Sequence, residues 1–247
     1  MKFHILWLNA ILERSDHRVL KAFVSWSGGK DCCLAAYRAK QQGIKIVCLV
    51  NMVTADKKRS CSHGITARWI RQQAKAIGIP LLQFPTTTDN YQSVFTNALE
   101  ELHRHGVTAG VFGDIDFAPH REWIEQVCTP SGITSLLPLW GRNQNEIVTD
   151  FIDLGFQAMV VAAQADLLGK EWLGRTVDQK FLKGIVDLKK DITPCGEAGE
   201  FHTLVVDGPM FKQSLKIRDA VPEKRGEHWF WDIKKIELVE KVLGGST

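Results

Sequence analysis

The residues best suited to chemistry lie together in one short segment, 25–32, where an apolar run gives way to a pair of glycines. Because Gly28 and Gly29 lack a Cβ, their main-chain N–H groups can turn toward one anion, and a helix starting after them would add its positive N-terminal dipole. Lys30 could neutralise part of a triphosphate, and Asp31 could hold a Mg²⁺ ion that bridges the phosphate oxygens. We therefore predict a phosphate-binding loop, with an ordinary tight turn as the alternative, formed by Ser25, Ser27, Gly28, Gly29, Lys30, Asp31 and Cys32.

The spacing of the glycines argues against the most common nucleotide-binding loop. That loop needs four residues between its two glycines, whereas here the glycines are adjacent. A kinase or GTPase built on that loop is therefore disfavoured.

The elements around this segment alternate between strand and helix patterns. Apolar, partly β-branched runs predict strands, and helical spacing of the apolar residues between them predicts helices. The predicted strands are 22–26, 45–53, 80–84, 110–112 and 136–139, and the predicted helices are 31–42, 66–77, 91–105 and 121–129. This alternation predicts an α/β fold with a doubly wound parallel sheet, in which ligands bind at the carboxyl ends of the strands. The segment 27–31 would lie at that edge, together with the loops 54–64 and 113–119.

Both of these loops carry polar side chains. In the first, His63 and Gly64 could help to cover a nucleotide, although a solvated loop with His63 packed near the helix start is an alternative. Cys61 and His63 are too few ligands for a structural zinc site. In the second, Asp114 and Asp116 could bind Mg²⁺ or substrate, or could simply cap the turn.

The second half of the chain predicts a smaller α/β domain. Its expected helices are 143–154 and 178–190, and its expected strands are 156–163 and 203–206. A change in the alternation of predicted strands and helices puts the domain boundary near Gly141. The expected organisation is an N-terminal extension over 1–20, a phosphate-binding domain over 21–141 and a substrate-binding domain over 142–247.

Four polar residues of this half could contribute to a site. Glu197 and Glu200 fall on a loop constrained by glycines, although an acidic surface turn has the same pattern. His202 would face either a cleft or the core, because side chains alternate along a strand. Arg175 could pair with a phosphate or a carboxylate through its planar fork, or could form a surface ion pair.

Composition limits the remaining possibilities. The net charge is +3 with the two signs interspersed, which gives no broad basic surface for nucleic acid. The six cysteines form no C-x-x-C pair, so we expect free thiols in a reducing compartment and a cytoplasmic protein. No apolar run reaches the roughly 20 residues that a membrane-spanning helix needs. The oligomeric state stays open.

Several motifs occur in an order that carries a family resemblance, over roughly residues 21–240. Residues 27–31 resemble the PP-loop of the ATP pyrophosphatases, except that Cys32 stands where that family usually carries Ser or Thr. The hydroxyl contact to phosphate would then be missing or replaced by a weaker thiol contact. Together with this loop, five further motifs resemble the diphthine ammonia ligase family: His63-Gly64-Ile65, Leu139-Trp140-Gly141, Glu171-Trp172-Leu173-Gly174-Arg175, Gly196-Glu197-Ala198-Gly199-Glu200-Phe201-His202-Thr203 and Asp207-Gly208-Pro209-Met210-Phe211.

The resemblance implies an ATP-binding domain of the PP-loop, adenine nucleotide alpha hydrolase-like type, followed by a family-specific domain. It implies a ligase that adenylates a carboxylate with ATP and Mg²⁺, after which ammonia attacks and AMP and pyrophosphate are released. The implied acceptor is diphthine, the modified histidine of translation elongation factor 2, which would be a protein partner.

The same resemblance implies roles for the candidate residues. Glu197 and Glu200 would orient ammonia, accept its proton or hold the trimethylammonium group of the substrate. The implied catalytic residues are Lys30, Asp31, Glu197 and Glu200, with Asp31 as the metal ligand; His63 and Gly64 join the loop in binding ATP; and the implied substrate-binding residues are Asp114, Arg175, Glu197, Glu200 and His202.

Two other functions stay open. The same ATP chemistry could serve another acceptor, such as a corrinoid-related small molecule in a bacterium, and the unusual Cys32 and Asp114-Ile115-Asp116 support keeping that alternative. The chain could also be a regulator that binds ATP without turning it over. Loss of Asp31 or Glu197 would abolish product formation by either enzyme but would leave a regulator functional.

Overall fold

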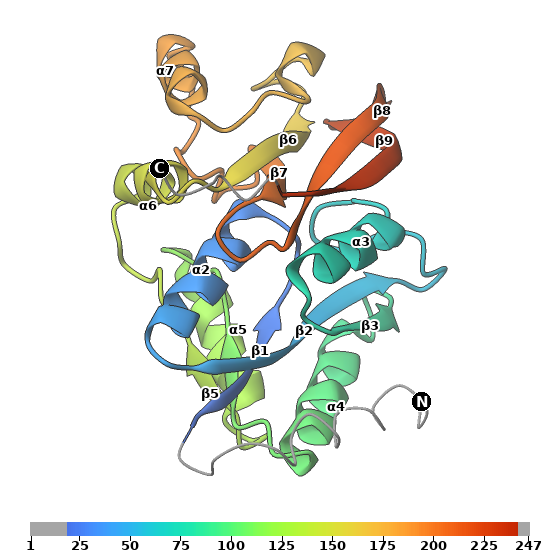
Figure 1. Cartoon of the computed structure of the whole chain (residues 1–247), viewed down its shortest axis with the longest axis vertical. Coiled ribbons are helices and arrows are strands. Elements are labelled where there is room, and N and C mark those ends of the chain that lie inside the picture. Colours follow the sequence, from blue (N-terminus) through green and yellow to red (C-terminus); the bar gives the residue numbers. More distant parts are fainter. Residues whose placement is uncertain (1–18, 242–247) are drawn as a thin grey trace. The chain divides into compact units, whose positions relative to one another are not determined.

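The computed structural model describes residues 19–241, which Figure 1 colours along the sequence. Two compact units divide the described chain: the first holds residues 19–27 together with Asp31–Ser62 and Ile79–Arg142, and the second holds Gly28–Lys30, His63–Gly78 and residues 143–241. The units therefore interleave along the sequence, whereas the predicted division at Gly141 is a single cut and stays a prediction. Residues 1–18 of the predicted extension lie outside the described residues.

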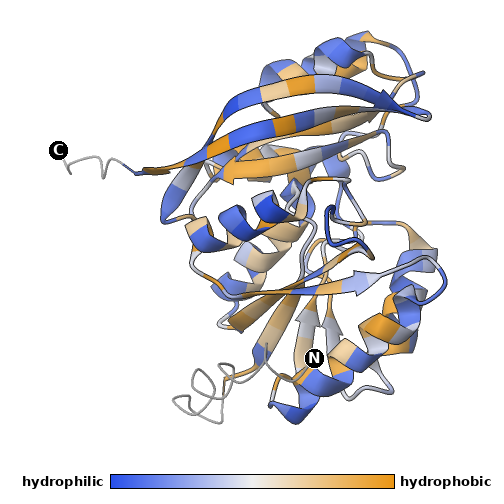
Figure 2. Ribbon diagram, turned by 90° about the vertical axis from the view of Figure 1, so that its right-hand side faces the viewer, coloured by the Kyte–Doolittle hydropathy of each residue, from blue (hydrophilic) through white to orange (hydrophobic). Residues whose placement is uncertain are grey.

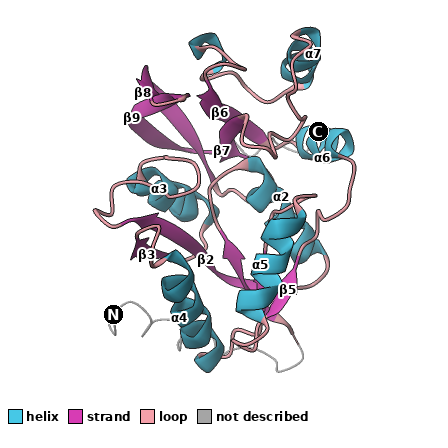
Figure 3. Cartoon of the chain, turned by 180° about the vertical axis from the view of Figure 1, so that it is seen from behind, coloured by secondary structure: helices cyan, strands magenta, loops and turns pink. Residues whose placement is uncertain are grey.

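The first unit contains a five-stranded parallel sheet of order β3-β2-β1-β4-β5. Figure 3 separates its strands and helices by colour. The strands are β1 (Lys21–Ser25), β2 (Lys45–Thr54), β3 (Leu81–Thr86), β4 (Ala109–Val111) and β5 (Thr134–Leu136), and the helices are α2 (Lys30–Gln41), α4 (Tyr91–Arg104) and α5 (Ala118–Cys128). The predicted α/β class with a parallel sheet is confirmed.

The strand order places a topological switch point between β1 and β4. From β1 the chain moves outward to β2 and β3, and from β4 it moves the opposite way to β5. In sheets of this kind ligands bind outside the carboxyl ends of the strands at the switch point. The segment 25–31 follows β1 there, and the segment 112–117 follows β4.

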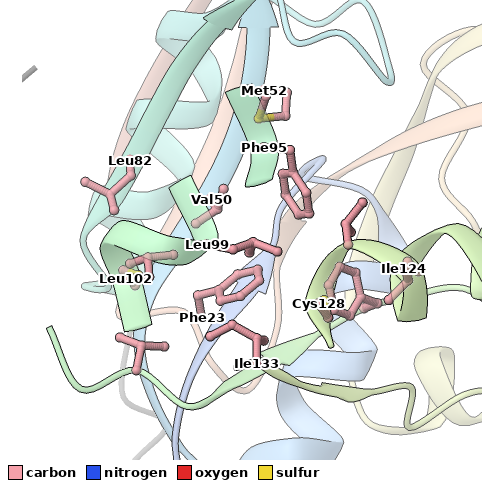
Figure 4. Close-up of a cluster of buried hydrophobic side chains, with 14 of the residues drawn as sticks. Phe23, Val50, Met52, Leu82, Phe95, Leu99, Leu102, Ile124, Cys128 and Ile133 are labelled. Atoms are coloured by element: carbon pink, nitrogen blue, oxygen red, sulfur yellow. The ribbon is translucent and has the colours of Figure 1, made fainter. Parts of the chain in front are cut away.

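The core on one side of this sheet is apolar and aromatic, as Figure 4 shows. α4 buries Phe95, Ala98, Leu99 and Leu102, whose spacing puts them on one stripe of the helix. Phe23 of β1 lies edge-on to Phe95, with ring centroids 6.4 Å apart and planes at 75°. Each large apolar side chain that leaves water here stabilises the fold by roughly 1.5–3 kcal/mol. This packing fixes β1, and with it the start of the loop that follows.

The second unit contains a four-stranded antiparallel sheet of order β7-β6-β9-β8. The sequence patterns predict β6 and β7 but miss β8 and β9, the two longest strands described. The strands are β6 (Gln157–Gln164), β7 (Phe201–Asp207), β8 (Gln213–Arg225) and β9 (His228–Glu240), and the helices are α3 (Ala67–Ile77), α6 (Gln144–Asp153), the 3-10 helix η2 (Lys170–Trp172) and α7 (Gln179–Asp187).

The turn between β8 and β9 has a sequence signal. Arg225 pairs with His228, so that Gly226 and Glu227 alone connect the strands. Gly226 has a φ of +56° and the φ of Glu227 is negative, which fits a type II′ turn with glycine at its first central position. Hydrophilic and hydrophobic bands alternate along this long hairpin in Figure 2. Such alternation is typical of an antiparallel sheet with one covered face.

Helix α3 packs on this hairpin. The indole N–H of Trp69 donates to the Ile233 carbonyl at 2.9 Å, and the Lys212 N–H donates to the Ala76 carbonyl at 2.7 Å. The helix ends at Gly78, whose φ of +80° is the left-handed conformation that commonly closes a helix. α3 therefore belongs to the second unit, although the chain runs through it between β2 and β3.

Several predicted boundaries are wrong, and two of them have a clear local reason. β5 ends at Leu136 rather than Leu139, because Pro138 lacks the N–H that a strand ladder needs. α7 ends at Asp187 rather than three residues later, and Lys189 adopts a φ of +51° that an α-helix does not contain. Across residues 19–241, no helix combines the length and the apolar character needed to cross a membrane.

Candidate active site

The loop 25–31 is fixed at the point where β1 ends. The Trp26 N–H donates to the Val50 carbonyl at 2.7 Å, which extends the pairing of β1 with β2 by one residue. The Trp26 carbonyl accepts a hydrogen bond from Asn51 Nδ2 at 2.8 Å, and its indole is buried. Ser25 closes the strand and Ser27 is the first residue after this anchor, so the predicted loop begins from a rigid base.

A buried amide network, which the sequence analysis missed, supports the same region. Asn51 is 2% exposed, and its side-chain N–H group also donates to Ser60 Oγ at 2.9 Å. The Gln83 amide donates to Asn51 Oδ1 at 3.0 Å. One side chain therefore contacts the end of β1, the strand β3 and the loop after β2. A buried polar group is costly unless it is hydrogen-bonded, and a lone asparagine inside the apolar run 45–54 is the sequence signal for this network.

In the second unit, two glycines of the loop approach other side chains closely. Gly28 has a φ of +87°, which residues with a side chain rarely adopt, and a Cβ there would lie 2.6 Å from Ile70 Cδ1. A Cβ on Gly29 would lie 2.4 Å from His63 Cε1. His63, which the sequence places near the nucleotide, therefore packs directly on the loop.

Helix α3 and strand β7 hold the main chain of the loop. Gln73 is fully buried, and its amide donates to the Gly28 carbonyl at 2.9 Å and to the Val205 carbonyl at 2.7 Å. The Val205 N–H donates to the same Gly28 carbonyl at 3.0 Å. The Lys30 N–H donates to Thr203 Oγ1 at 3.0 Å. These residues form a rigid frame for the glycine pair, and neither Gln73 nor Thr203 is a predicted site residue.

The Lys30 side chain is enclosed by protein groups. It is 3% exposed, its ammonium donates to the Cys195 carbonyl, and it lies 5.3 Å from the centroid of the Phe201 ring. A carbonyl and an aromatic face both stabilise a cation that has left water. The ammonium has three donors, so a contact of Lys30 with a triphosphate would use a donor other than the one on Cys195.

His63 and His202 form a stacked pair, with ring centroids 4.5 Å apart and planes at 19°. His63 Nδ1 lies 3.2 Å from the Thr203 carbonyl oxygen, a contact that requires a proton on this nitrogen. Burial, with a smaller contribution from His202, lowers the pKa of His63 well below its usual value. Burial and the charge of Lys30 lower the pKa of His202 to about 4. Both rings are therefore uncharged at neutral pH.

The loop 193–200 carries the two predicted carboxylates, and they differ in environment. Glu200 is 2% exposed, and its Oε1 accepts a hydrogen bond from the Thr193 N–H at 2.6 Å. Its Oε2 is buried and has no hydrogen-bond partner among residues 19–241. Glu197 is half-buried, and its N–H donates to Thr193 Oγ1 at 2.9 Å. The structure thus separates one fully buried carboxylate from one at the surface of the loop.

In the first unit, the segment after β4 lies against the first turn of α2. A Cβ on Gly113 would lie 2.7 Å from the Cys32 nitrogen and 2.8 Å from the Asp31 carbonyl carbon. Glycine alone allows this approach of the segment after β4 to the main chain of Asp31 and Cys32. The Asp114 carboxylate lies 3.2 Å from His120 Nδ1.

Cys32 takes the position where the resembled PP-loop carries a hydroxyl. It is buried, and Ser27 Oγ donates a hydrogen bond to its Sγ at 3.5 Å. Sulfur is a weak acceptor, so this contact restrains Ser27 less than an oxygen would.

Tyr91 is a further residue in this region that the sequence analysis did not single out. Burial raises the pKa of its phenol to about 12, and the nearby Cys61 and Asp114 add to the shift. The phenol therefore keeps its proton at neutral pH and is suited to donate a hydrogen bond. Its sequence position at the start of α4 gives no signal of this, because the neighbours come from two other loops.

Arg175 and Gly64 make their contacts elsewhere. Arg175 Nε donates to the Glu171 carbonyl at 3.0 Å, and its guanidinium lies 4.1 Å from the Trp172 ring, so the described contacts of this side chain lie within its own turn. A Cβ on Gly64 would lie 2.7 Å from Phe230 Cε1, which shows that this glycine packs against the β8–β9 hairpin.

The described residues contain no preformed multi-ligand metal centre. Within 19–241, no group of three or more His, Cys, Asp or Glu side chains is arranged to hold a metal ion. A Mg²⁺ ion that arrives with ATP needs only one or two carboxylates besides the phosphates. Asp31, in the first turn of α2, is a carboxylate of the chemical type that such an ion takes.

Two protein-family models match the chain in order. The Diphthamide synthase N-terminal domain matches residues 20–135, and the Diphthamide synthase C-terminal domain matches residues 143–239. Together they span both units of the described structure.

Curated relatives show the same similarity. A Diphthine–ammonia ligase of Schizosaccharomyces pombe is 28% identical over 234 residues, which cover 84% of this chain and 38% of that protein. A Diphthine–ammonia ligase of Danio rerio is 26% identical over 217 residues, which cover 77% of this chain and 84% of that protein. Among solved structures, a predicted subunit of a tRNA methyltransferase from Methanocaldococcus jannaschii has a TM-score of 0.42 and 15% identity, over 77% of this chain and 98% of that chain.

Proposed function

This chain belongs to the diphthine ammonia ligase family, and from that membership we propose that it couples ATP cleavage to the amidation of a carboxylate by ammonia. AMP and pyrophosphate are the other products. The proposed acceptor is diphthine on translation elongation factor 2. The observation that carries this proposal is the glycine loop 25–31, which follows β1 at the switch point of the parallel sheet inside the matched N-terminal domain.

The first step of the reaction is the adenylation of the carboxylate. A free carboxylate has a poor leaving oxygen, whereas an acyl adenylate has AMP as a good leaving group. The glycine loop and the N-terminus of α2 stabilise the negative charge that develops on pyrophosphate. Mg²⁺, when it is bound with ATP, would neutralise part of the phosphate charge, and Asp31 would hold it.

Lys30 contributes its charge to the same step. Its ammonium bonds to the Cys195 carbonyl in the described structure. A phosphate oxygen is charged and therefore a stronger acceptor than a carbonyl. We expect the ammonium to stabilise the phosphate charge that develops as pyrophosphate leaves, with the loop main chain still held by Gln73 and Thr203.

The second step is the attack of ammonia on the acyl adenylate. Glu197 and Glu200 act in this step, by orienting the nitrogen donor or the cationic group of the acceptor. Asp114, Arg175 and His202 belong to the acceptor site in this proposal. The domain over 21–141 binds ATP and that over 142–247 binds the acceptor. All six cysteines are free thiols, which supports a cytoplasmic location.

The test combines ATP, Mg²⁺ and ammonium with the protein, with and without elongation factor 2 that carries diphthine. AMP is measured together with the mass of the factor. AMP and a mass change from acid to amide support the proposal, and Asp31→Asn should abolish both. AMP without the mass change would move the acceptor to another molecule, such as a corrinoid-related acid. ATP binding without any AMP would overturn the ligase in favour of a regulator.

A further inference from the structure

The carboxylate of Glu200 has one satisfied oxygen and one unsatisfied oxygen. Oε1 accepts from the Thr193 N–H at 2.6 Å, whereas Oε2 is buried and has no partner among residues 19–241. An unpaired acceptor that is buried costs free energy, and proteins generally satisfy such an atom with a donor, a water molecule or an ion. The position of Oε2 is therefore one at which a small donor would bind favourably.

Glu200 cannot turn away to relieve this cost. The Gln164 N–H donates to its carbonyl at 2.9 Å, and Thr193 holds its Oε1 atom. The segment just before it contains two glycines in the left-handed backbone conformation, Gly196 with a φ of +69° and Gly199 with a φ of +84°. Main chain and side chain are thus both fixed with Oε2 unsatisfied.

Glu200 forms no ion pair within the described part of the chain. No Lys, Arg or His side chain in residues 19–241 donates to its Oε2 atom. Burial and the charge of Lys30 lower the pKa of His202 to about 4, and the Glu200 carboxylate opposes this shift only in part, so that the ring stays uncharged. A cation can therefore approach Glu200 without repulsion from this imidazole.

Contacts connect Glu200 with the glycine loop. His202 stacks on His63, and a Cβ on Gly29 would touch His63. Phe201, the next residue along the chain, lies against Lys30. The two residues that follow Glu200 along the chain therefore contact the phosphate-binding loop or its neighbour His63 in the second unit.

We infer that Glu200 Oε2 binds the ammonium ion that supplies nitrogen to the amidation, an inference that rests on the proposed function. Ammonium is small and has N–H donors that would satisfy a buried acceptor. A trimethylammonium group has no N–H to donate, so burial of Oε2 favours ammonium over that part of the acceptor.

The chemical step balances with this assignment. Ammonium transfers one proton to Glu200, and the nitrogen lone pair that is released forms the C–N bond to the acyl carbon. The bond between the acyl carbon and the phosphate oxygen breaks, and its electron pair leaves with AMP. The departing phosphate takes the second proton from nitrogen, and Glu200 later returns its proton to solvent.

The kinetic test compares Glu200→Gln with the natural protein, using elongation factor 2 that carries diphthine. Glutamine keeps an oxygen for the Thr193 N–H but replaces the charged acceptor by an N–H₂ group. We expect the KM for ammonium to rise about ten- to a hundredfold, as for the loss of a hydrogen bond to a charged group. The KM values for ATP and for the factor should stay unchanged. The exposed Glu227→Gln is the matched control.

Hydroxylamine separates this role from a structural one. It is a strong nucleophile that is largely uncharged at neutral pH, so it needs neither capture as a cation nor the loss of a proton before it attacks. Glu200→Gln should form the hydroxamate at nearly the rate of the natural protein. Loss of this reaction as well would show that the substitution damages folding or adenylation, which would overturn the assignment.

A binding measurement needs no turnover. Ammonium chloride should raise the melting temperature of the natural protein above that in equal tetramethylammonium chloride, and Glu200→Gln should abolish the difference. An unchanged KM for ammonium in the variant, or a KM raised for the factor instead, would overturn the ammonium site and leave the ligase in place. Absence of AMP from the natural protein with either nucleophile would overturn the ligase and the site together.

Discussion

The rings of His63 and His202 lie face to face, with their centroids 4.5 Å apart, although His63 lies in the loop between β2 and α3 and His202 lies on β7. Two imidazoles can stack this closely in a buried setting because both are uncharged. Their low pKa values are thus a consequence of the packing that also places His63 on Gly29.

The stack predicts a loss of stability in acid. In the unfolded chain a histidine binds a proton near pH 6.5, whereas His202 in the fold does so at about 4. The unfolded state therefore binds more protons between these values, and stability falls as the pH drops through this window, by up to about 1.4 kcal/mol per pH unit for each histidine. Above this pH range the uncharged histidines contribute their full stabilisation to the fold.

Urea unfolding at a series of pH values from 7 to 4 measures this effect. His202→Gln should flatten the acid side of the profile, whereas His103→Gln, at an exposed position on α4, should leave its slope unchanged. A profile of His202→Gln that runs parallel to that of the natural protein would contradict the prediction.

Gln73 predicts a link between stability and ATP binding. Gln73→Met keeps the length of the side chain but removes two donors, so the Val205 carbonyl loses its partner and Gly28 keeps only one of two bonds. We expect a loss of about 1–3 kcal/mol in the free energy of unfolding, together with a higher KM for ATP. Urea unfolding and AMP formation measure the two quantities.

Gln72→Met is the matched control, because the neighbouring glutamine lies on the same helix without a buried role. If Gln73→Met lowers stability but leaves the KM for ATP at its original value, the residue supports the fold alone.

Lys30 predicts a large loss of activity with little change in nucleotide affinity. Lys30→Met removes a buried positive charge that stabilises the transition state for pyrophosphate release. We therefore expect AMP formation to slow by about a hundred- to a thousandfold. Lys30→Arg should not restore it, because the side chain is nearly fully buried and a larger planar group does not fit. Lys40→Met, exposed on the same helix, is the control. Full AMP formation by Lys30→Met would contradict this role.

Replacement of Cys32 by serine should improve the binding of ATP. Cys32→Ser replaces a weak sulfur acceptor by a hydroxyl that bonds both Ser27 and a phosphate oxygen more strongly. We expect the KM for ATP to fall by about three- to tenfold, in line with one neutral hydrogen bond. Initial rates of AMP formation over a range of ATP concentrations give this value. If the KM for ATP is equal or higher in a variant of unchanged melting temperature, the thiol does not weaken the binding of ATP by this loop.

Local patterns predicted much of the first unit. The alternation of apolar strands and amphipathic helices depends on residues close in sequence, so the parallel sheet could be recognised from the chain alone. The predicted end of β5 was wrong because the apolar run continues past the strand, whereas Pro138 has no N–H for the hydrogen bonds between strands. The β8–β9 hairpin was missed, although Gly226 carries a turn signal, because one glycine between polar residues is a weak local pattern.

Only the tertiary structure decided how the candidate site is assembled. The pattern of α3 predicts a buried stripe but not that the stripe packs on β8 and β9, whose residues lie far along the chain. Gln73, Thr203 and Asn51 acquire their roles from partners that sequence spacing cannot identify. The sequence alone offers Glu197 and Glu200 as equal candidates, and burial separates them, because desolvation and hydrogen bonding depend on every neighbour that folding brings together.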